Sequence, residues 1–570
     1  VAMSQSSIGK AVRYGLIAGL VATSVSAIGM VETFNERDII TGILTLGQVL
    51  LYSTPIIAGY LAIRTENNQQ LSAGPALVNG LVAGFITAVP VVGLVLLTVA
   101  FPNIRNALVN VSPALIEALT FGQGPFVGSL ILTAIMSALG LAGAAFHLLP
   151  EKVEKPLLNG VAWTLGVGLF SEVLINIFRP FPRQIVRVLF GTSGIQPLIA
   201  VIIFVIAVLV TIWWEARGGE RFASRREAQT EEDKQRNRRI TLILGGIFVL
   251  AAPWILGLYL TEVMDVVGIF IIMGLGLNIV VGFAGLLDLG YVAFFAIGAY
   301  AMGLLTSTGE LGLAEPLNFW MALPLSVLAA TTAGIILGIP VLRMRGDYLA
   351  IVTLAFGEII RVLAQSDLLK EAIGGAQGIL KIGKPEVLSF VFIQPQHFYY
   401  LILAGIVLAW FVSSRLRDAR LGRQWMALRE DEDVAEAQGI NLTNTKLLAF
   451  AIGATFSGLA GAIFASRLSS IFPHSFNLLI SINVLCLVIV GGIGSLPGVV
   501  LGAFVLVGMP ELLREFAEYR LLLYGALLIV TMLVRPEGLW PSQVRKRELH
   551  ADEEEAAREG PHHEDIHALT

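Results

Sequence analysis

The chain has 570 residues, of which 55% are hydrophobic and 14% are charged. Soluble domains carry about 25% charged residues, so this composition excludes an ordinary soluble protein. Apolar segments follow one another along almost the whole chain, which predicts an all-α, polytopic integral membrane protein. The single cysteine, Cys486, cannot form an internal disulfide, and no cluster of Cys and His has the spacing of a metal site.

The net charge of −4 is distributed unevenly along the chain. Residues 548–570 hold eight acidic residues and one arginine, so we expect residues 546–570 to form a disordered, acidic cytoplasmic tail. The rest of the chain carries a small positive charge, with its basic residues in short loops. No basic face indicates binding to nucleic acid.

The sequence predicts about sixteen membrane-spanning helices, because a bilayer core needs about 20 apolar residues per helix. Six predicted spans precede a charged segment, at residues 13–31, 39–63, 75–100, 126–149, 157–178 and 195–214. Ten follow it, at residues 240–259, 263–282, 289–306, 319–341, 347–365, 398–414, 446–466, 478–494, 497–512 and 518–535. We therefore expect an N-terminal membrane extension at 1–214, a charged cytoplasmic linker at 215–239 and a transport domain at 240–545. The first span is predicted to be retained rather than cleaved, because acidic residues follow it in place of a small-residue cleavage site.

Lys and Arg residues in short loops mark the cytoplasmic side of a membrane protein. In this chain they gather at 215–239, 343–345, 415–446 and 535–547. With ten spans after the linker, all four sites fall on one side, which predicts that both termini lie in the cytoplasm. A further cluster would lie outside, made of Arg179, Arg183 and Arg187. Either that cluster is anchored at the membrane interface, or the number of N-terminal spans differs from six.

The glycine-rich apolar segment 273–291 is the first candidate for a translocation path. Glycine permits close helix packing and also unwound backbone at membrane depth. Asn278 and Asp288 favour a path, because polar groups at depth usually line a cavity or bind a partner. A position of Asp288 near a membrane surface is the alternative. The predicted path residues are Asn278, Gly282, Gly285, Asp288, Tyr291 and Glu358.

Glu358 and Arg361 lie three residues apart in an apolar segment, so they share one helix face and can pair. A structural ion pair inside the bundle is the first interpretation, and direct contact with a substrate is the second. Glu172 in the fifth predicted span is a similar candidate.

Motifs of soluble enzymes are not fulfilled in this sequence. Residues 378–384 have the spacing of a phosphate-binding loop, but Pro385 stands where the magnesium-binding Ser or Thr belongs. The chain contains neither a Gly-x-Ser-x-Gly elbow nor a His-Glu-x-x-His motif. We therefore predict no catalytic residue, no cofactor and no resident metal, and expect any ATP hydrolysis to occur in separate subunits.

The predicted cytoplasmic loop 415–446 is too charged to enter lipid, yet it has a helical pattern. Trp425, Leu428 and Ala435 fall near one face of the predicted helix, and Gly439 with Asn441 marks its end. An amphipathic helix lying on the membrane is one interpretation, and a docking helix that receives force from a soluble partner is the other. The predicted coupling residues are Trp425, Leu428, Arg429, Glu430, Ala435, Ala437 and Gly439.

Six segments, in chain order, resemble the M-type permease subunit of branched-chain amino-acid ABC importers. They are residues 278–300 with GFAGLLDLGY, 343–361, 374–379, 422–430 with 437–441, 491–498 with GGIGSLPG, and 535–540 with RPEGLW. The resemblance implies a bacterial inner-membrane permease for hydrophobic amino acids. It also implies a second homologous permease, two cytoplasmic ATP-binding subunits and a substrate-binding protein outside. In that family the loop after Arg429 docks into the ATPase, while residues 1–239 have no counterpart and suggest a degenerate permease half or an accessory bundle.

Three alternative functions follow from the same sequence. An ABC permease for urea or short amides has a similar sequence. An ion-coupled secondary transporter would need intramembrane acids, for which Asp288, Glu358 and Glu172 are few. An intramembrane hydrolase would need a Ser/His, paired-Asp or zinc constellation that the sequence lacks.

Overall fold

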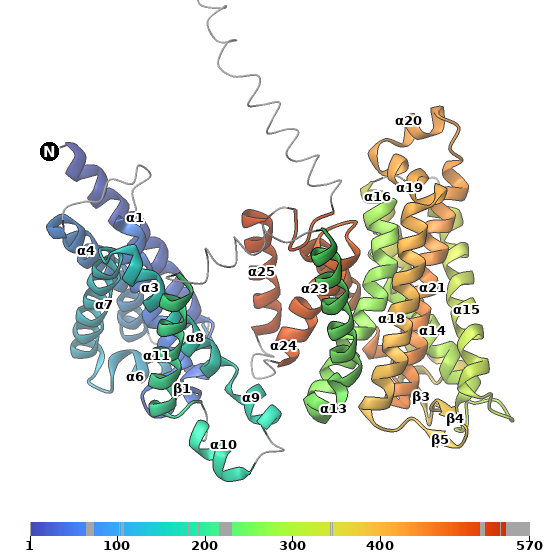
Figure 1. Cartoon of the computed structure of the whole chain (residues 1–570), viewed down its shortest axis with the longest axis horizontal. Helices are drawn as coiled ribbons and strands as arrows, with labels where there is room; N and C mark the ends of the chain where they lie inside the picture. The colour runs from blue at the N-terminus through green and yellow to red at the C-terminus, as the bar shows by residue number, and fades with distance from the viewer. Residues whose placement is uncertain are drawn as a thin grey trace, which may run out of the picture. The chain divides into compact units, whose positions relative to one another are not determined.

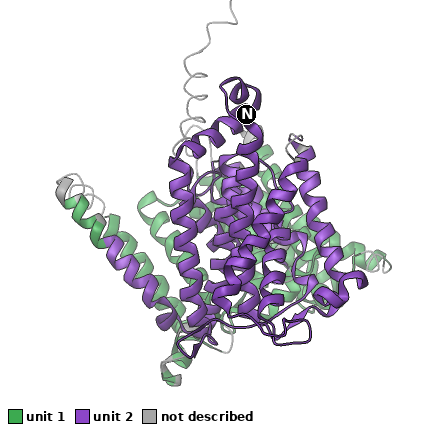
Figure 2. Ribbon diagram, turned by 90° about the vertical axis from the view of Figure 1, so that its right-hand side faces the viewer, with its two compact units in different colours: residues 1–240 green, residues 241–570 purple. Residues whose placement is uncertain are grey.

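The computed structural model describes residues 2–63, 73–101, 103, 108–178, 182–191, 194–215, 231–341, 344, 346–512, 519–535 and 537–542. The chain divides into two compact units, residues 1–240 and 241–570, each with its own hydrophobic core (Figure 2). Most of the predicted linker, at 216–230, and the predicted tail lie outside the described residues, as does Arg179.

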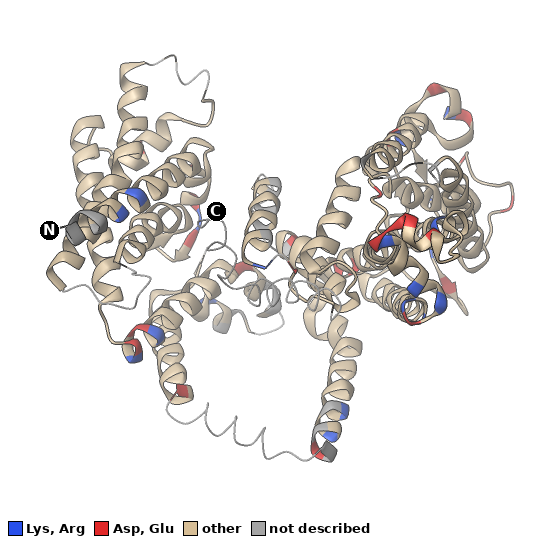
Figure 3. Cartoon of the chain, turned by 90° about the horizontal axis from the view of Figure 1, so that it is seen from above, with Lys and Arg blue, Asp and Glu red and all other residues tan. Residues whose placement is uncertain are grey.

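The described residues form an almost wholly helical protein, which confirms the predicted all-α class (Figure 1). Ten of their helices are long and apolar enough to cross a membrane, and three shorter apolar helices accompany them. Charged residues are sparse along these helices (Figure 3). The predicted spans fall on helical segments of the structure, although Phe170 divides the span 157–178 between two helices. The protein is a multi-pass membrane protein.

The long helices of the N-terminal unit are α1 (Ala2–Ala27), α3 (Leu46–Ile63), α4 (Ala73–Ala100), α7 (Pro125–His147), α8 (Glu151–Leu169) and α11 (Pro197–Trp213). Shorter elements join them: α2 (Met30–Thr33), η1 (Phe34–Glu36), β1 (Asp38–Ile40), β2 (Leu44–Thr45), α6 (Pro113–Thr120), α9 (Ser171–Phe178) and α10 (Arg183–Leu189). Helices α4 and α7 approach so closely at Gly80, Gly84 and Gly140 that an added Cβ would meet the other helix. Small residues let helices pack this closely in lipid.

Two N-terminal spans differ from their predicted limits. The second begins at Leu46, because residues 38–45 form the antiparallel β1–β2 hairpin, in which Gly42 N donates to Asp38 Oδ2 at 3.2 Å. Helix α8 is not among the ten candidate spans, since its first two turns hold Glu151 and Glu154 with two lysines.

The helices of the C-terminal unit follow in chain order as α13 (Glu231–Leu277), η3 (Asn278–Phe283), α14 (Val292–Thr306), α15 (Phe319–Val341), α16 (Asp347–Gln365), η4 (Asp367–Leu369), α17 (Lys370–Ile373), η5 (Gly375–Gln377), α18 (Pro395–Asp418), α19 (Arg420–Glu430), α20 (Glu432–Ala437), α21 (Leu442–Leu468), η6 (Pro473–Ser475), α22 (Leu478–Gly491), α23 (Leu496–Ala503), η7 (Phe504–Gly508), α24 (Met509–Leu512) and α25 (Arg520–Val534). Helices η3 and η7 are π-helical. Two antiparallel strand pairs close one end of the unit: β3 (Ile379–Leu380) with β6 (Ser470–Ile471), and β4 (Glu386–Val387) with β5 (Phe390–Val391).

Helix α13 contains the predicted span 240–259 and most of the span 263–282, which ends in η3, and a sharp break separates the two. A straight helix of its length would measure about 70 Å, more than twice a bilayer core. Gly257 interrupts it with φ 77°, which glycine adopts readily. Thr261 Oγ1 lies 3.3 Å from Pro253 O, although a straight helix separates residues eight positions apart by about 12 Å. The chain therefore turns sharply at Gly257.

Helix α21 forms the centre of the C-terminal unit and packs against α14 and α15. Gly298 of α14 faces Gly458 of α21, and Gly461 lies against the backbone of Phe295. An added Cβ at Gly298 or Gly461 would overlap the backbone of the other helix, and one at Gly458 would overlap the Ala330 side chain of α15. This packing fixes α14, and with it the irregular backbone that precedes α14.

Candidate functional site

The backbone between η3 and α14, residues 284–291, is not helical, and most of its residues are buried, whereas Gly285 is exposed. Asp288 in this segment is fully buried, and its Oδ1 accepts a hydrogen bond from Gly290 N at 2.9 Å. Helix α16 covers the segment: Leu289 N donates to Thr353 Oγ1 at 3.0 Å, and a Cβ on Gly290 would overlap the Thr353 carbonyl. Irregular backbone in a membrane protein is tolerated where surrounding protein satisfies its polar groups, as Thr353 does for Leu289 N.

Asn278 and Tyr291 hold the two ends of this irregular region. Asn278 is buried, and its Oδ1 accepts from Gly494 N at 2.9 Å, which ties η3 to the loop between α22 and α23. Tyr291 is buried, its hydroxyl donates to Gly453 O at 2.8 Å, and its backbone carbonyl accepts from Ser457 Oγ at 3.1 Å. In this conformation both predicted path residues are packed contacts within the bundle.

The predicted ion pair forms on α16, but its position corrects the first interpretation. Arg361 Nε donates to Glu358 Oε1 at 2.9 Å, and the side chains are 28% and 44% exposed, respectively. The pair therefore lies on the outer surface of α16 rather than inside the bundle. The reason is helical phase: Thr353 and Gly357 turn toward residues 288–290, which leaves the pair on the flank of the helix.

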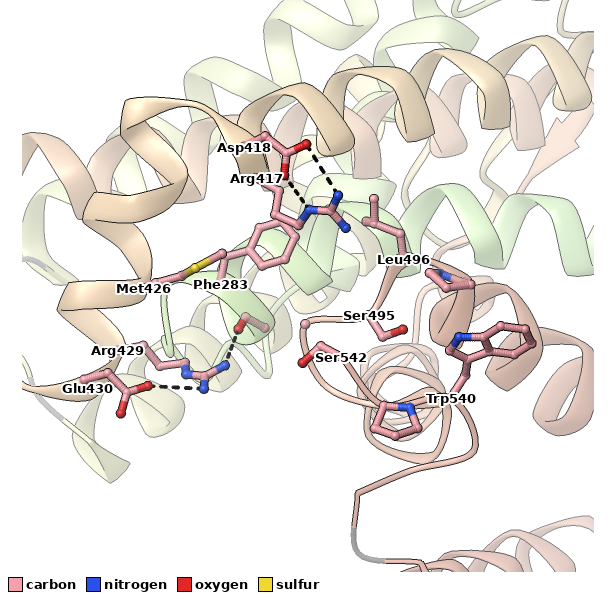
Figure 4. Close-up of a pocket in the computed structure, with 14 residues that line it drawn as sticks. Phe283, Arg417, Asp418, Met426, Arg429, Glu430, Ser495, Leu496, Trp540 and Ser542 are labelled. Atoms are coloured by element: carbon pink, nitrogen blue, oxygen red, sulfur yellow. Dashed lines mark hydrogen bonds and ion pairs between the residues drawn. The ribbon is translucent and has the colours of Figure 1, made fainter. Parts of the chain in front are cut away.

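The two predicted residue sets, path and coupling, meet at Arg429. Arg429 of α19 donates through Nη1 to Gly282 O at 3.0 Å, at the C-terminal end of η3 (Figure 4). Gly285, with φ 71°, lies directly beneath the Arg429 side chain, since an added Cβ would overlap the Arg429 Cγ atom. The sequence suggested each residue separately; the contact between them comes from the fold.

Three predicted coupling residues face the protein's own chain. Trp425 is fully buried and donates its indole N–H to Thr445 O at 2.8 Å, and Leu428 and Ala435 are also buried. The expectation that these side chains form the contact face for a partner is therefore wrong in its orientation. Their apolar face is covered by the ends of η3, α18 and α21. Of the remaining coupling residues, Glu430, Ala437 and Gly439 are exposed. Val434, which was not among the predicted coupling residues, is 52% exposed.

Helix α20 is set rigidly on the start of α21. Asp431 caps α20 by accepting from Val434 N at 2.9 Å, and Asn441 caps α21 by accepting from Asn444 N at 3.0 Å. Lys446, only 2% exposed, reaches back from α21 to Glu432 at 2.7 Å. The sequence placed Lys446 only among the basic residues of the loop 415–446. A lysine one turn after a helix cap, at the start of an apolar run, was the signal for this contact.

A pocket of about 510 Å³ lies between α18, α19, the end of η3 and the segments 494–497 and 540–542 (Figure 4). Two ion pairs border it, Arg417 with Asp418 at 2.9 Å and Arg429 with Glu430 at 3.3 Å. Trp540 lies on the opposite wall. The pocket thus lies between α19 and the α22–α23 loop, directly beside the Arg429 contact. Among the described residues no group of His, Cys, Asp and Glu could hold a metal ion.

Comparison with known proteins identifies relatives over this unit. Residues 259–532 match the family described as the permease component of branched-chain amino acid transport systems. The high-affinity branched-chain amino acid permease protein LivM of Salmonella typhimurium is 42% identical over 325 residues, covering 53% of this chain and 75% of that protein. The probable LivM of Methanocaldococcus jannaschii is 24% identical over 321 residues, covering 48% and 91%. The LivH permease protein of Escherichia coli K12 is 33% identical over 127 residues, covering 22% and 41%.

No solved structure matches the chain. The matched range 259–532 contains every predicted path and coupling residue, from Asn278 to Gly439. It leaves residues 1–258 outside the family match. On the strength of these matches, the chain belongs to the family of permease components of branched-chain amino acid transport systems.

Proposed function

We propose that this protein is the permease subunit of an ATP-driven importer that carries branched-chain, hydrophobic amino acids across the cytoplasmic membrane of a bacterium. The observation that carries the proposal is the 42% identity to the LivM permease over 75% of that protein. The similarity to a LivH permease protein supports a second, homologous permease as partner. Two cytoplasmic ATP-binding subunits and an external substrate-binding protein complete the proposed assembly.

The domain arrangement is part of this proposal. Residues 240–545 form the transport domain, and residues 1–214 form a membrane extension joined through the linker at 215–239. Both termini lie in the cytoplasm, on the side where Lys and Arg collect in short loops. Helices α19 and α20, which lie at the end of the C-terminal unit opposite β3 and β4 (Figure 1), then face the ATPase.

The contact between Arg429 and Gly282 supports a route for coupling. Movement of α19 by an ATPase would displace the Gly282 carbonyl, and with it η3 and the irregular backbone at 284–291. π-Helical turns are rare and occur frequently at functional sites, so η3 suits an element that takes part in coupling. The pocket beside Arg429 supplies space for that displacement.

Purification of the full chain from membranes, followed by reconstitution of whatever complex co-purifies, tests the proposal. We expect the complex to contain ATP-hydrolysing subunits. We also expect isoleucine uptake that depends on ATP supplied on the membrane side where these subunits lie. Uptake of urea in place of isoleucine would favour the amide permease. Uptake that needs no ATP and collapses with a proton or sodium ionophore would instead establish an ion-coupled transporter.

A further inference from the structure

Helix α16 carries a charged pair at a depth where charge is costly. The helix has 19 residues and is about 28 Å long, close to the thickness of a bilayer core. Glu358 lies about 16 Å from its first residue, near the middle of that length. Glu358 and Arg361 are nevertheless partly exposed, at 44% and 28%. A hydrocarbon environment does not explain this position, since ionised groups in membrane helices usually face a cavity or a protein partner.

The ion pair between α21 and α13 is a structural pair with which Glu358 and Arg361 can be compared. Arg467 near the end of α21 binds Asp265 of α13 at 3.2 Å, and the two side chains are 10% and 0% exposed. That pair joins two helices and is shielded from its surroundings. Glu358 and Arg361 belong to one helix, and within the part of the chain that the structure describes they pair only with each other. Their pairing adds little to the stability of α16, because exposed pairs three residues apart are weak.

The residues beside the pair form an apolar exposed stripe. Ile351 and Val362 are 62% and 51% exposed, and Ala355 is exposed between them. Positions 351, 355, 358 and 362 lie three or four residues apart, so they share one face of α16. This face combines one carboxylate, one guanidinium and an aliphatic surface.

We propose that the substrate route passes along this face of α16, and that Glu358 and Arg361 bind the α-ammonium and α-carboxylate of the passing amino acid. The inference builds on the import function proposed above. An amino acid carries one charge of each sign, so it can exchange partners with the pair without leaving either residue unpaired. Arg binds carboxylates with two parallel N–H donors, and a Glu carboxylate accepts from an ammonium group.

The remaining surface fits the side chain of the same substrate. Ile351, Ala355 and Val362 offer aliphatic contacts to a branched hydrocarbon chain. In the empty route the two charged residues neutralise each other, which lowers the cost of keeping them at membrane depth. Urea carries neither charge and would gain nothing from this arrangement.

The test uses the co-purified complex in liposomes and measures isoleucine uptake, complex assembly and basal ATP hydrolysis. Glu358→Gln and Arg361→Gln should each lower uptake about tenfold or more, as expected for loss of a charge-assisted contact, while assembly and basal ATP hydrolysis persist. The double exchange Glu358→Arg with Arg361→Glu keeps an ion pair on the helix but reverses its order, and uptake should stay low. Asp233→Asn and Arg236→Gln provide the matched control, because that pair has the same spacing at the start of α13 and lies outside the proposed route.

Full uptake in the charge-exchanged variant, or uptake within about twofold of wild type in both glutamine variants, would show a merely structural pair and overturn the inference. A wild-type complex that takes up no isoleucine would instead refute the import function itself.

A second measurement tests the substrate route if a charge variant fails to assemble. In a Cys486→Ser background, cysteines at Ala355 and Val362 should react with a small water-soluble thiol reagent and be protected by isoleucine. A cysteine at Ile336, 62% exposed on α15, is the control, because α15 holds no charged residue and lies outside the proposed route, and it should not react. Unreactive cysteines at 355 and 362 would exclude a water-filled route there.

Discussion

Lys446 and Glu432 form an ion pair of 2.7 Å in which the lysine side chain is only 2% exposed. The pair joins the first turn of α20 to the second turn of α21, the central helix of the C-terminal unit. Trp425 adds a second tie, because its indole donates to the carbonyl of Thr445, the residue before Lys446. Helices α19 and α20 are therefore a rigid extension of the membrane bundle rather than a loose loop.

The first prediction concerns the stability of that junction. Glu432→Ala leaves a buried ammonium without its partner, and breaking such a pair should cost on the order of 3 kcal/mol. We expect a clear drop in the melting temperature of the detergent-solubilised protein, measured by loss of the monodisperse peak after heating. The double change Glu432→Ala with Lys446→Met should recover much of the loss, because it removes the unpaired charge. Glu436→Ala, an exposed residue of the same helix, should change little, and an equal drop there would argue against the pair as the cause.

The second prediction concerns coupling through Arg429. Arg429→Ala removes the hydrogen bond to Gly282 O but leaves Trp425 and Leu428 to hold α19 in place. We expect the ATPase to stay bound and to hydrolyse ATP, while uptake falls about tenfold or more because the force no longer reaches η3. Arg420→Ala, at the exposed first residue of α19, is the matched control. Normal uptake in Arg429→Ala would remove this contact from the coupling route.

The third prediction concerns the surface that meets the ATPase. Ala435 is 1% exposed, so Ala435→Arg should disrupt the packing of α20 and lower the yield of folded protein. Val434 is 52% exposed, so Val434→Arg should leave the fold intact and weaken binding of the ATPase, because an apolar contact would receive a charge. Co-purification measures the binding, and the neighbouring exposed Asp433→Asn is the control. Unchanged co-purification with Val434→Arg would place the contact elsewhere.

The fourth prediction concerns sidedness. Gln377 lies next to β3, which pairs with β6 after the end of α21, whereas Glu436 lies in α20 before the start of α21. These two exposed residues thus sit at opposite ends of one membrane-spanning helix. In a Cys486→Ser background, a cysteine at 377 should react with an impermeant thiol reagent in intact cells, and a cysteine at 436 should react only after the membrane is opened. The reverse pattern would invert the proposed topology and the direction of transport.

Much of the site was predictable from the type and spacing of its residues. The glycine-rich apolar segment with Asn278 and Asp288 allowed both close helix packing and irregular backbone, and η3 with residues 284–291 provides the irregular backbone. The i, i+3 spacing of Glu358 and Arg361 predicted their pairing, because it follows from one turn of a helix. These are local relationships, and local sequence is sufficient for them.

What sequence could not give was the direction in which a side chain faces once helices have packed. The apolar face of α19 and α20 suits a partner protein and the ends of neighbouring helices equally well, so Trp425, Leu428 and Ala435 were assigned to the wrong neighbour. The exposure of Glu358 was missed for the same reason, since it depends on which flank of α16 meets residues 288–290.

The sequence by itself determined that this protein lies in a lipid bilayer and in which order its helices follow one another. Apolar runs of fixed length have one stable arrangement in a bilayer, because a helix satisfies its backbone hydrogen bonds internally. Only the tertiary structure decided that Arg429 would reach Gly282, 147 positions away, and that Lys446 would turn back to Glu432. Such contacts arise from the relative placement of packed helices, which depends on many weak side-chain contacts summed over the bundle and is not encoded in the periodicity of any one segment.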